Sequence, residues 1–118
     1  MLQNMQCYGF VVYLQNKTIK DMDKVVVMQK LSDAKEHLRQ YGVSAIGLFG
    51  STVREENRKD SDIDILIDFV GGQETYINYL AVCALLEQLF ENHQVDIVTR
   101  NGLSQHIGPA ILKEVEYV

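Results

Sequence analysis

Apolar residues recur at helical spacing in the segment that follows Asp23, and Gly42 ends the pattern. Spacings of three and four residues place such side chains on one face of a helix. Aspartate is a common helix cap, and glycine often follows the last helical residue. The pattern predicts an amphipathic helix from an Asp23 cap to Gly42. Its apolar stripe consists of Val27, Leu31, Ala34, Leu38 and Tyr41.

Three short apolar runs, rich in β-branched residues, predict strands at 43–49, 62–69 and 95–98. The pair Gly71-Gly72 breaks the second run. Helices are predicted near Thr52, from about Glu74 to Glu91, and from Pro109 to about Val115. The alternation predicts an α/β domain in which helices flank a small mixed sheet.

The predicted helix 74–91 is apolar around almost its whole circumference. In its central part only Asn78, Glu87 and Gln88 interrupt the apolar surface. Such a helix has to be covered on more than one side. Two alternatives stay open, namely a helix sandwiched between the sheet and the first helix, or a helix that forms part of a protein interface.

Residues 1–22 are treated as an N-terminal extension, and residues 23–118 as a single domain. The run 8–14 has strand propensity. It is interpreted either as an added edge strand or interface arm, or as the product of a start codon chosen too early. In the second case Met22 or Met28 is the true start.

Composition narrows the class of function. A chain of 118 residues, 47% hydrophobic, forms one domain with its own core. A net charge of −5 argues against stable nucleic-acid binding, which requires a basic surface. Cys7 and Cys83 have no metal or redox spacing, and no apolar run reaches the length of a membrane span. The chain is expected to work in a reducing cytoplasm.

The residues Gly50, Ser51 and Arg54 are predicted to bind phosphate, and together they are called the phosphate cradle. Gly50 and Ser51 end the strand 43–49 and open a turn toward the predicted helix. Backbone N–H groups at such a turn are unpaired, and glycine allows a ligand to approach closely. The Arg54 guanidinium would pair with a phosphate oxygen.

Acidic residues in two of the predicted strands form a candidate metal site. Asp62 and Asp64 are two residues apart, so their side chains share one face of a strand. Asp96, between Val95 and Ile97, is expected to be buried and to supply a third carboxylate. Carboxylates of this kind suit Mg²⁺, which shares its coordination sphere with substrate phosphates.

Each motif also has an ordinary structural explanation. A Gly-Ser turn between strand and helix is common, and paired aspartates often form a solvated turn or a weak calcium loop. Asp96 alone is more often an edge-strand residue. Because the motifs occur together in the order that nucleotidyl transfer requires, they favour a site for a nucleotide and a metal.

The chain resembles minimal nucleotidyltransferases of the DNA polymerase beta superfamily over about residues 28–118. The resemblance rests on four stretches of sequence. They are Gly47-Leu48-Phe49-Gly50-Ser51, Arg54, Asp60-Ser61-Asp62-Ile63-Asp64 and Val95-Asp96-Ile97-Val98. It implies a polymerase-beta-like fold, a metal-binding triad of Asp62, Asp64 and Asp96 with two Mg²⁺ ions, and ATP as substrate. The chain departs from the family where Glu55 and Glu56 follow the arginine in place of glycine.

The resemblance also implies a partner. Stand-alone domains of this type are often antitoxins of helical HEPN ribonucleases, and the family adds AMP to a tyrosine of such a toxin. The expected function is therefore transfer of AMP to a protein hydroxyl. Two alternatives remain, namely a non-catalytic antitoxin that masks its partner, and a transferase for aminoglycoside-like small molecules, for which a homo-oligomer could complete the acceptor site.

Overall fold

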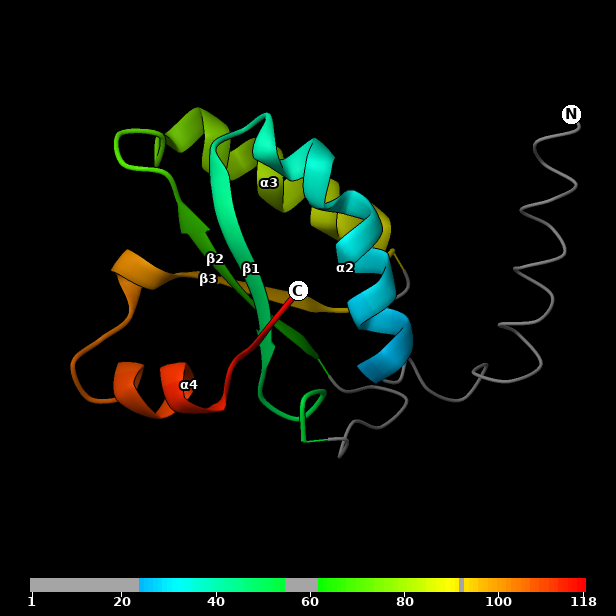
Figure 1. The fold of residues 1–118 in the computed structure, drawn as a ribbon, viewed down its shortest axis with the longest axis vertical. Coiled ribbons are helices and arrows are strands. Elements are labelled where there is room, and N and C mark those ends of the chain that lie inside the picture. The colour runs from blue at the N-terminus through cyan, green and yellow to red at the C-terminus, as the bar shows by residue number, and fades with distance from the viewer. Residues whose placement is uncertain (1–23, 55–61, 92) are drawn as a thin grey trace, which may run out of the picture.

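The computed structural model describes residues 24–54, 62–91 and 93–118 (Figure 1). The predicted extension 1–22, the Asp23 cap and the residues Glu55 and Glu56 lie outside this range. The elements are α2 (Lys24–Arg39), β1 (Val43–Phe49), β2 (Ile63–Phe69), α3 (Tyr76–Leu89), β3 (Val95–Thr99), the 3-10 helix η1 (Arg100–Gly102), α4 (Gly108–Glu114) and β4 (Glu116–Tyr117).

The strands form one mixed sheet in the order β3-β2-β1-β4. β1 is antiparallel to both β2 and β4, whereas β2 and β3 are parallel. A parallel pair needs a crossover connection, and α3 supplies it between β2 and β3. The architecture confirms the predicted α/β class with a small mixed sheet.

The predicted apolar stripe of α2 forms much of the core. Val27, Leu31 and Leu38 are fully buried, and they belong to one cluster with Ile65 and Ile67 of β2. α2 and α3 lie side by side on this face of the sheet (Figure 1). The helical spacing in the sequence therefore identified the residues that attach α2 to the sheet.

Gly47, in the middle of β1, allows the chain after α4 to approach the sheet closely. β4 pairs with β1 through Gly47 and Tyr117. A Cβ atom on Gly47 would lie 2.5 Å from Cγ2 of Val115, closer than packed carbon atoms allow. This fourth strand, of only two residues, was not predicted from the sequence.

α3 starts at Tyr76, later than predicted, because the Thr75 hydroxyl caps it and accepts a hydrogen bond from the Asn78 N–H at 3.1 Å. Its residues Val82 and Leu86 are fully buried, but Ile77 is 78% exposed. The sheet and α2 therefore cover only part of its apolar surface. Neither α3 nor any other helix among the described residues is long and apolar enough to cross a membrane.

We expect Leu31→Ala to lower the free energy of unfolding by about 2–5 kcal/mol, because it leaves a cavity between α2 and the sheet. Val25→Ala is the control, since Val25 lies on the same helix and is 74% exposed. Its effect should stay within about 0.5 kcal/mol. Urea denaturation measures both values, and equal losses would contradict the packing of α2 described above.

Candidate active site

Parallel pairing between β2 and β3 brings two of the predicted acids together. Asp64 and Asp96 are direct partners in the register of the two strands. Partner residues of adjacent strands project from the same face of a sheet. The neighbouring pair Ile65 and Ile97 projects from the opposite face, where α2 and α3 pack. Asp64 and Asp96 therefore lie side by side on the face away from those helices.

The expectation that Asp96 is buried is wrong. Its side chain is exposed, because β3 is an edge strand and this face of it is not covered by α2 or α3. Asp62 is also exposed and stands directly before β2. Asp64 is half-buried. The three acids thus differ in solvent contact.

Gly50 lies close to Asp64 and has a backbone conformation that favours glycine. Phe49, the last residue of β1, is the register partner of Asp64. Gly50 follows it with φ of 76°, and a Cβ atom there would lie 2.1 Å from Oδ2 of Asp64. Any other side chain would be strained and would also displace the carboxylate. The structure thus brings the phosphate cradle and the candidate metal site into contact.

The segment after Gly50 differs from the prediction. Residues 51–54 form a turn in which the Arg54 N–H donates to the Gly50 carbonyl at 3.2 Å. The described residues therefore show a single helix-like turn. The helix expected from Thr52 is not present up to Arg54, and its continuation at 55–61 lies outside the described range.

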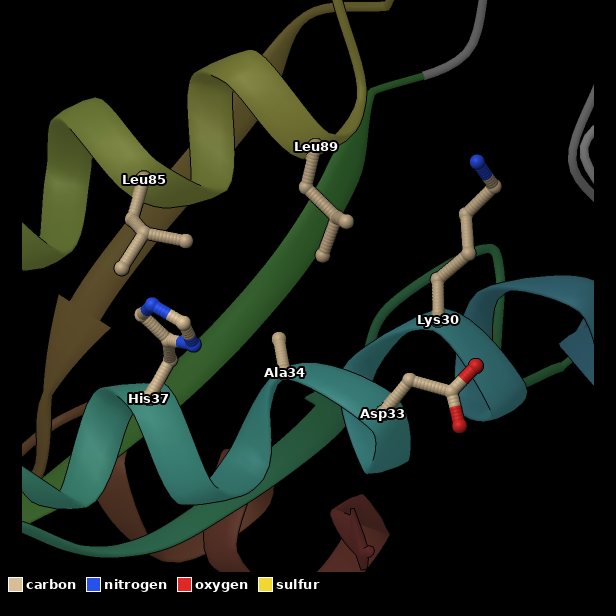
Figure 2. Close-up of a pocket in the computed structure, with 6 residues that line it drawn as sticks. All are labelled: Lys30, Asp33, Ala34, His37, Leu85 and Leu89. Carbon is tan, nitrogen blue, oxygen red and sulfur yellow. The ribbon is translucent and has the colours of Figure 1, made fainter. Parts of the chain in front are cut away.

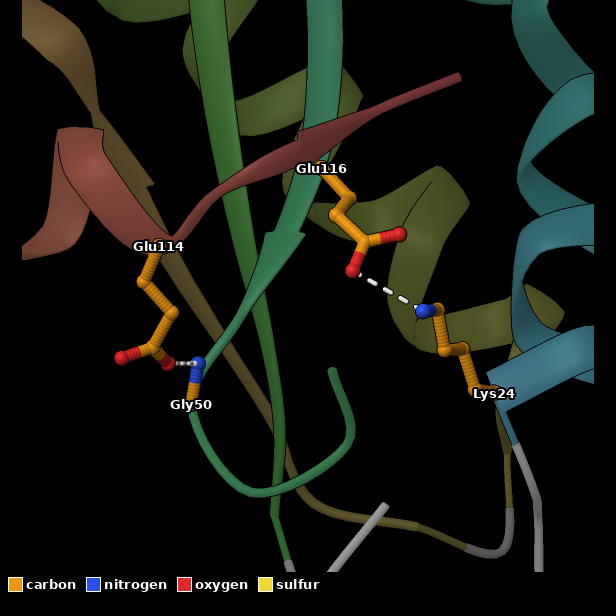
Figure 3. A network of polar contacts seen from close by, with 4 residues as sticks. All are labelled: Lys24, Gly50, Glu114 and Glu116. Carbon is orange, nitrogen blue, oxygen red and sulfur yellow. Dashed lines mark hydrogen bonds and ion pairs between the residues drawn. The ribbon is translucent and has the colours of Figure 1, made fainter. Parts of the chain in front are cut away.

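Glu114, the last residue of α4, belongs to the site and was missed by the motif analysis. Its Oε1 atom accepts a hydrogen bond from the Gly50 N–H (Figure 3) and another, at 2.8 Å, from Nη1 of Arg54. The contact with Gly50 spans 64 residues of sequence. The helix predicted from Pro109 to about Val115 includes Glu114, but no local pattern marks a contact so distant in sequence.

Burial and neighbouring carboxylates raise the pKa of Asp64 from its ordinary value of 3.8 to about 6. Desolvation by burial has the largest effect, and repulsion from Asp96 and Asp62 adds to it. Arg54 acts in the opposite direction, while Glu114 contributes a smaller upward shift. A cation bound between these carboxylates would relieve the repulsion.

The chemistry of these donors suits a divalent metal ion. They are carboxylate oxygens, which Mg²⁺ prefers, and they lie beside a turn with phosphate-binding groups. In the conformation described, however, no three His, Cys, Asp or Glu side chains of the described residues come close enough together to hold one ion. The carboxylate oxygens are therefore donors of the type that Mg²⁺ prefers, and the side chains would have to move closer together to bind one ion.

A separate groove lies between α2 and α3. It is lined by Lys30, Asp33, Ala34, His37, Leu85 and Leu89 (Figure 2). Because these helices cover the other face of the sheet, the groove is remote from Asp64 and Asp96. It contains none of the predicted site residues and is not the nucleotide site.

The Gly50 turn after β1 lies beside Asp64 of β2, and Asp64 is the register partner of Asp96 on β3. This arrangement is typical of a nucleotide-dependent transferase. The chain matches the nucleotidyltransferase domain family over residues 27–118. It belongs to this family and is a nucleotidyltransferase.

Relatives and solved structures agree with this assignment. The chain is 35% identical over 101 residues to protein adenylyltransferase MntA of Thermococcus cleftensis, which covers 86% of this chain and 96% of the relative. A solved structure described as a minimal nucleotidyltransferase has a TM-score of 0.69 and 29% identity, covering 80% of this chain and 95% of the other. This similarity confirms the polymerase-beta-like fold.

A crystal structure of a toxin–antitoxin with AMP-PNP has a TM-score of 0.58 and 20% identity. The match covers 73% of this chain and 69% of that chain. At this identity the similarity supports the fold alone.

The raised pKa of Asp64 makes the stability of the apo protein depend on pH. Because this pKa is about 6 in the folded state, folded Asp64 keeps its proton where the unfolded group, near 3.8, has lost it. Stability should therefore fall as pH rises from about 4 to 6. With chelator present, Asp64→Asn should melt at a higher temperature than wild type at pH 7, and the difference should shrink toward pH 4.

The control is Asp33→Asn, on exposed α2 surface away from the site. The effect at Asp64 should be small, because solvent screens a half-exposed group. Melting temperatures at half-unit pH intervals measure it. A pH-independent difference between Asp64→Asn and wild type would contradict the described charge environment.

Proposed function

We propose that the chain transfers AMP from ATP to a hydroxyl group of a protein partner, in a reaction that depends on divalent metal ions. The observation that carries the proposal is the position of Asp64 and Asp96 as register partners, with the Gly50 turn in contact with Asp64. The similarity to a protein adenylyltransferase supports AMP as the transferred group and protein as the acceptor.

The phosphate cradle would hold the triphosphate. The Gly50 N–H lies at the end of β1, and glycine has no side chain of its own that would block a ligand there. Arg54 lies within reach of the same place, since both groups contact one carboxylate oxygen of Glu114. Ser51, between them in the turn, would add a hydroxyl donor.

Asp62, Asp64 and Asp96 would hold the metal ions, two Mg²⁺ by the chemistry of their oxygen donors. When bound, these ions would neutralise the phosphate charge and favour ionisation of the attacking hydroxyl. Burial raises the pKa of Asp64 most, and repulsion from Asp96 and Asp62 adds to it. A cation bound by these carboxylates would offset that repulsion, which is consistent with this role.

The reaction would proceed as an in-line displacement. The acceptor oxygen forms a bond with the α-phosphorus of ATP, and the bond from that phosphorus to the oxygen bridging to the β-phosphate breaks. Asp96, exposed at the edge of the sheet, takes the proton of the acceptor hydroxyl. Arg54 stabilises the charge on the departing pyrophosphate.

The proposed acceptor is an all-helical toxin of the HEPN type, with this chain as its antitoxin. The apolar surface of α3 suits such a partner. Tyr76, Ile77 and Leu80 are 76%, 78% and 46% exposed, and Val70, just before the α3 region, is 52% exposed. A cluster of large exposed apolar side chains favours a protein contact.

The function is tested by purifying the chain with its partner from the native cell and incubating the complex with ATP and Mg²⁺. We expect intact-mass analysis to show the gain of one or more AMP units on the partner. Asp64→Asn should abolish the gain, because it removes a charged oxygen ligand of the proposed metal site. The matched control is Asp68→Asn, on the same strand and face roughly 13 Å further along, which should retain transfer.

Three results would contradict all or part of the proposal. A stable complex without any change in mass would indicate an antitoxin that acts by masking its partner. Transfer of AMP by Asp64→Asn at the wild-type rate would refute the assigned site. If no protein partner appears and a small molecule is modified instead, the acceptor class is wrong although the transfer chemistry stands.

A further inference from the structure

The carboxylate of Glu114 lies among the groups that would bind phosphate. Its Oε1 accepts a hydrogen bond from the Gly50 N–H (Figure 3), and Nη1 of Arg54 is 2.8 Å from the same oxygen. The proposed function assigns both donors to the triphosphate. In this structure both donate to the Glu114 carboxylate instead.

The backbone after Glu114 is fixed to the sheet. Directly after it, Val115 packs against Gly47, and β4 pairs with β1. The Val118 N–H donates to the Ile46 carbonyl at 2.9 Å, and Lys35 Nζ donates to the Val118 carbonyl at 3.0 Å. The main chain of Glu114 is thus held beside the phosphate cradle.

The side chain of Glu114 is less restricted than its backbone. It is 30% exposed, and its Arg54 partner is 48% exposed. Rotation about its side-chain bonds would carry the carboxylate into solvent without moving β4. When the carboxylate leaves, it loses two charge-assisted hydrogen bonds, and an incoming anion can form hydrogen bonds of the same kind with the same donors.

We propose that Glu114 sets the affinity of the nucleotide site, because its carboxylate occupies the phosphate cradle and has to leave when a polyphosphate binds. This inference rests on the proposed function, in that it takes the phosphate cradle as the triphosphate site. A phosphate oxygen and the Glu114 carboxylate cannot share the Gly50 N–H, since two anions in contact repel one another.

The exchange lowers the affinity for every anion that takes the Gly50 N–H. A triphosphate carries more charge and reaches additional donors, such as the Ser51 hydroxyl, so it can replace what Glu114 contributes. Orthophosphate forms fewer contacts against the same displacement cost. Because this cost is common to both anions, Glu114 sets the concentration at which phosphates bind, whereas the number of contacts sets which phosphate binds more tightly.

The test compares Glu114→Gln with Glu116→Gln in the full chain. Glutamine keeps the length of the side chain and removes its charge. Glu116 is the matched control, because it also forms an ion pair, at 2.8 Å to Lys24 on the side of α2 (Figure 3), but does not contact the phosphate cradle. Isothermal titration calorimetry with ATP, tripolyphosphate and orthophosphate gives the dissociation constants.

Glu114→Gln should bind ATP and tripolyphosphate ~10-fold more tightly than wild type, since a charge-assisted contact no longer competes. Its gain for orthophosphate should be of similar size, because both anions displace the same carboxylate. Glu116→Gln should match wild type. Unchanged or weaker binding by Glu114→Gln would overturn the inference and show that Glu114 only shapes the turn.

A second measurement follows the Gly50 amide itself by ¹H-¹⁵N NMR. Tripolyphosphate should shift this signal in the wild type, and the carboxyl ¹³C signal of Glu114 should move toward that of a solvated glutamate. The inference is overturned if saturating tripolyphosphate leaves both signals unchanged. Folding of the variant is checked by the unchanged spectrum of α2.

Failure of the inference differs from failure of the proposed function. If AMP transfer to a partner occurs while Glu114→Gln has wild-type anion affinity, the inference is wrong and the function stands. If tripolyphosphate displaces Glu114 but no partner gains AMP, the inference stands and the function is wrong.

Discussion

Parallel pairing of β2 with β3 determines where the charged groups of this domain meet. In a sheet the two faces alternate residue by residue, so the register that buries Ile65 against α2 and α3 also sets Asp64 beside Asp96 on the other face. A slip of one residue would bury the acids and expose the isoleucines. Packing of the core and position of the acids therefore depend on the same backbone hydrogen bonds.

The two faces of the sheet have opposite energetic characters. One face gains stability from the cluster of buried apolar residues. On the other face, partial burial of Asp64 and repulsion from neighbouring carboxylates raise the pKa of Asp64. Within this site Arg54 provides a compensating positive charge, and it is shared with Glu114. The fold thus tolerates an electrostatically unfavourable site because the opposite face is well packed.

Much of this arrangement could be predicted from local sequence. The apolar stripe of α2 and the three longer strands follow from periodicities and turn residues within a few positions of each other, and the order of the motifs predicted that Gly50 and the acids share one site. An edge-strand position was one of two explanations of Asp96, and local sequence could not decide between them because the order of strands in the sheet does. Glu114 and β4 were missed since their contacts join segments far apart in sequence, although Gly47 inside a strand is the kind of residue that marks a close approach.

The hydrogen bond between the Gly50 N–H and Glu114 joins residues that the ribosome adds at different times. Gly50 leaves the ribosome 64 residues before Glu114. Until then β1 has no neighbour on its β4 side, and the donors of Gly50 and Arg54 are without the carboxylate that engages them in the finished fold. The groups proposed to bind the nucleotide therefore reach the arrangement described here only after Glu114 has been synthesised.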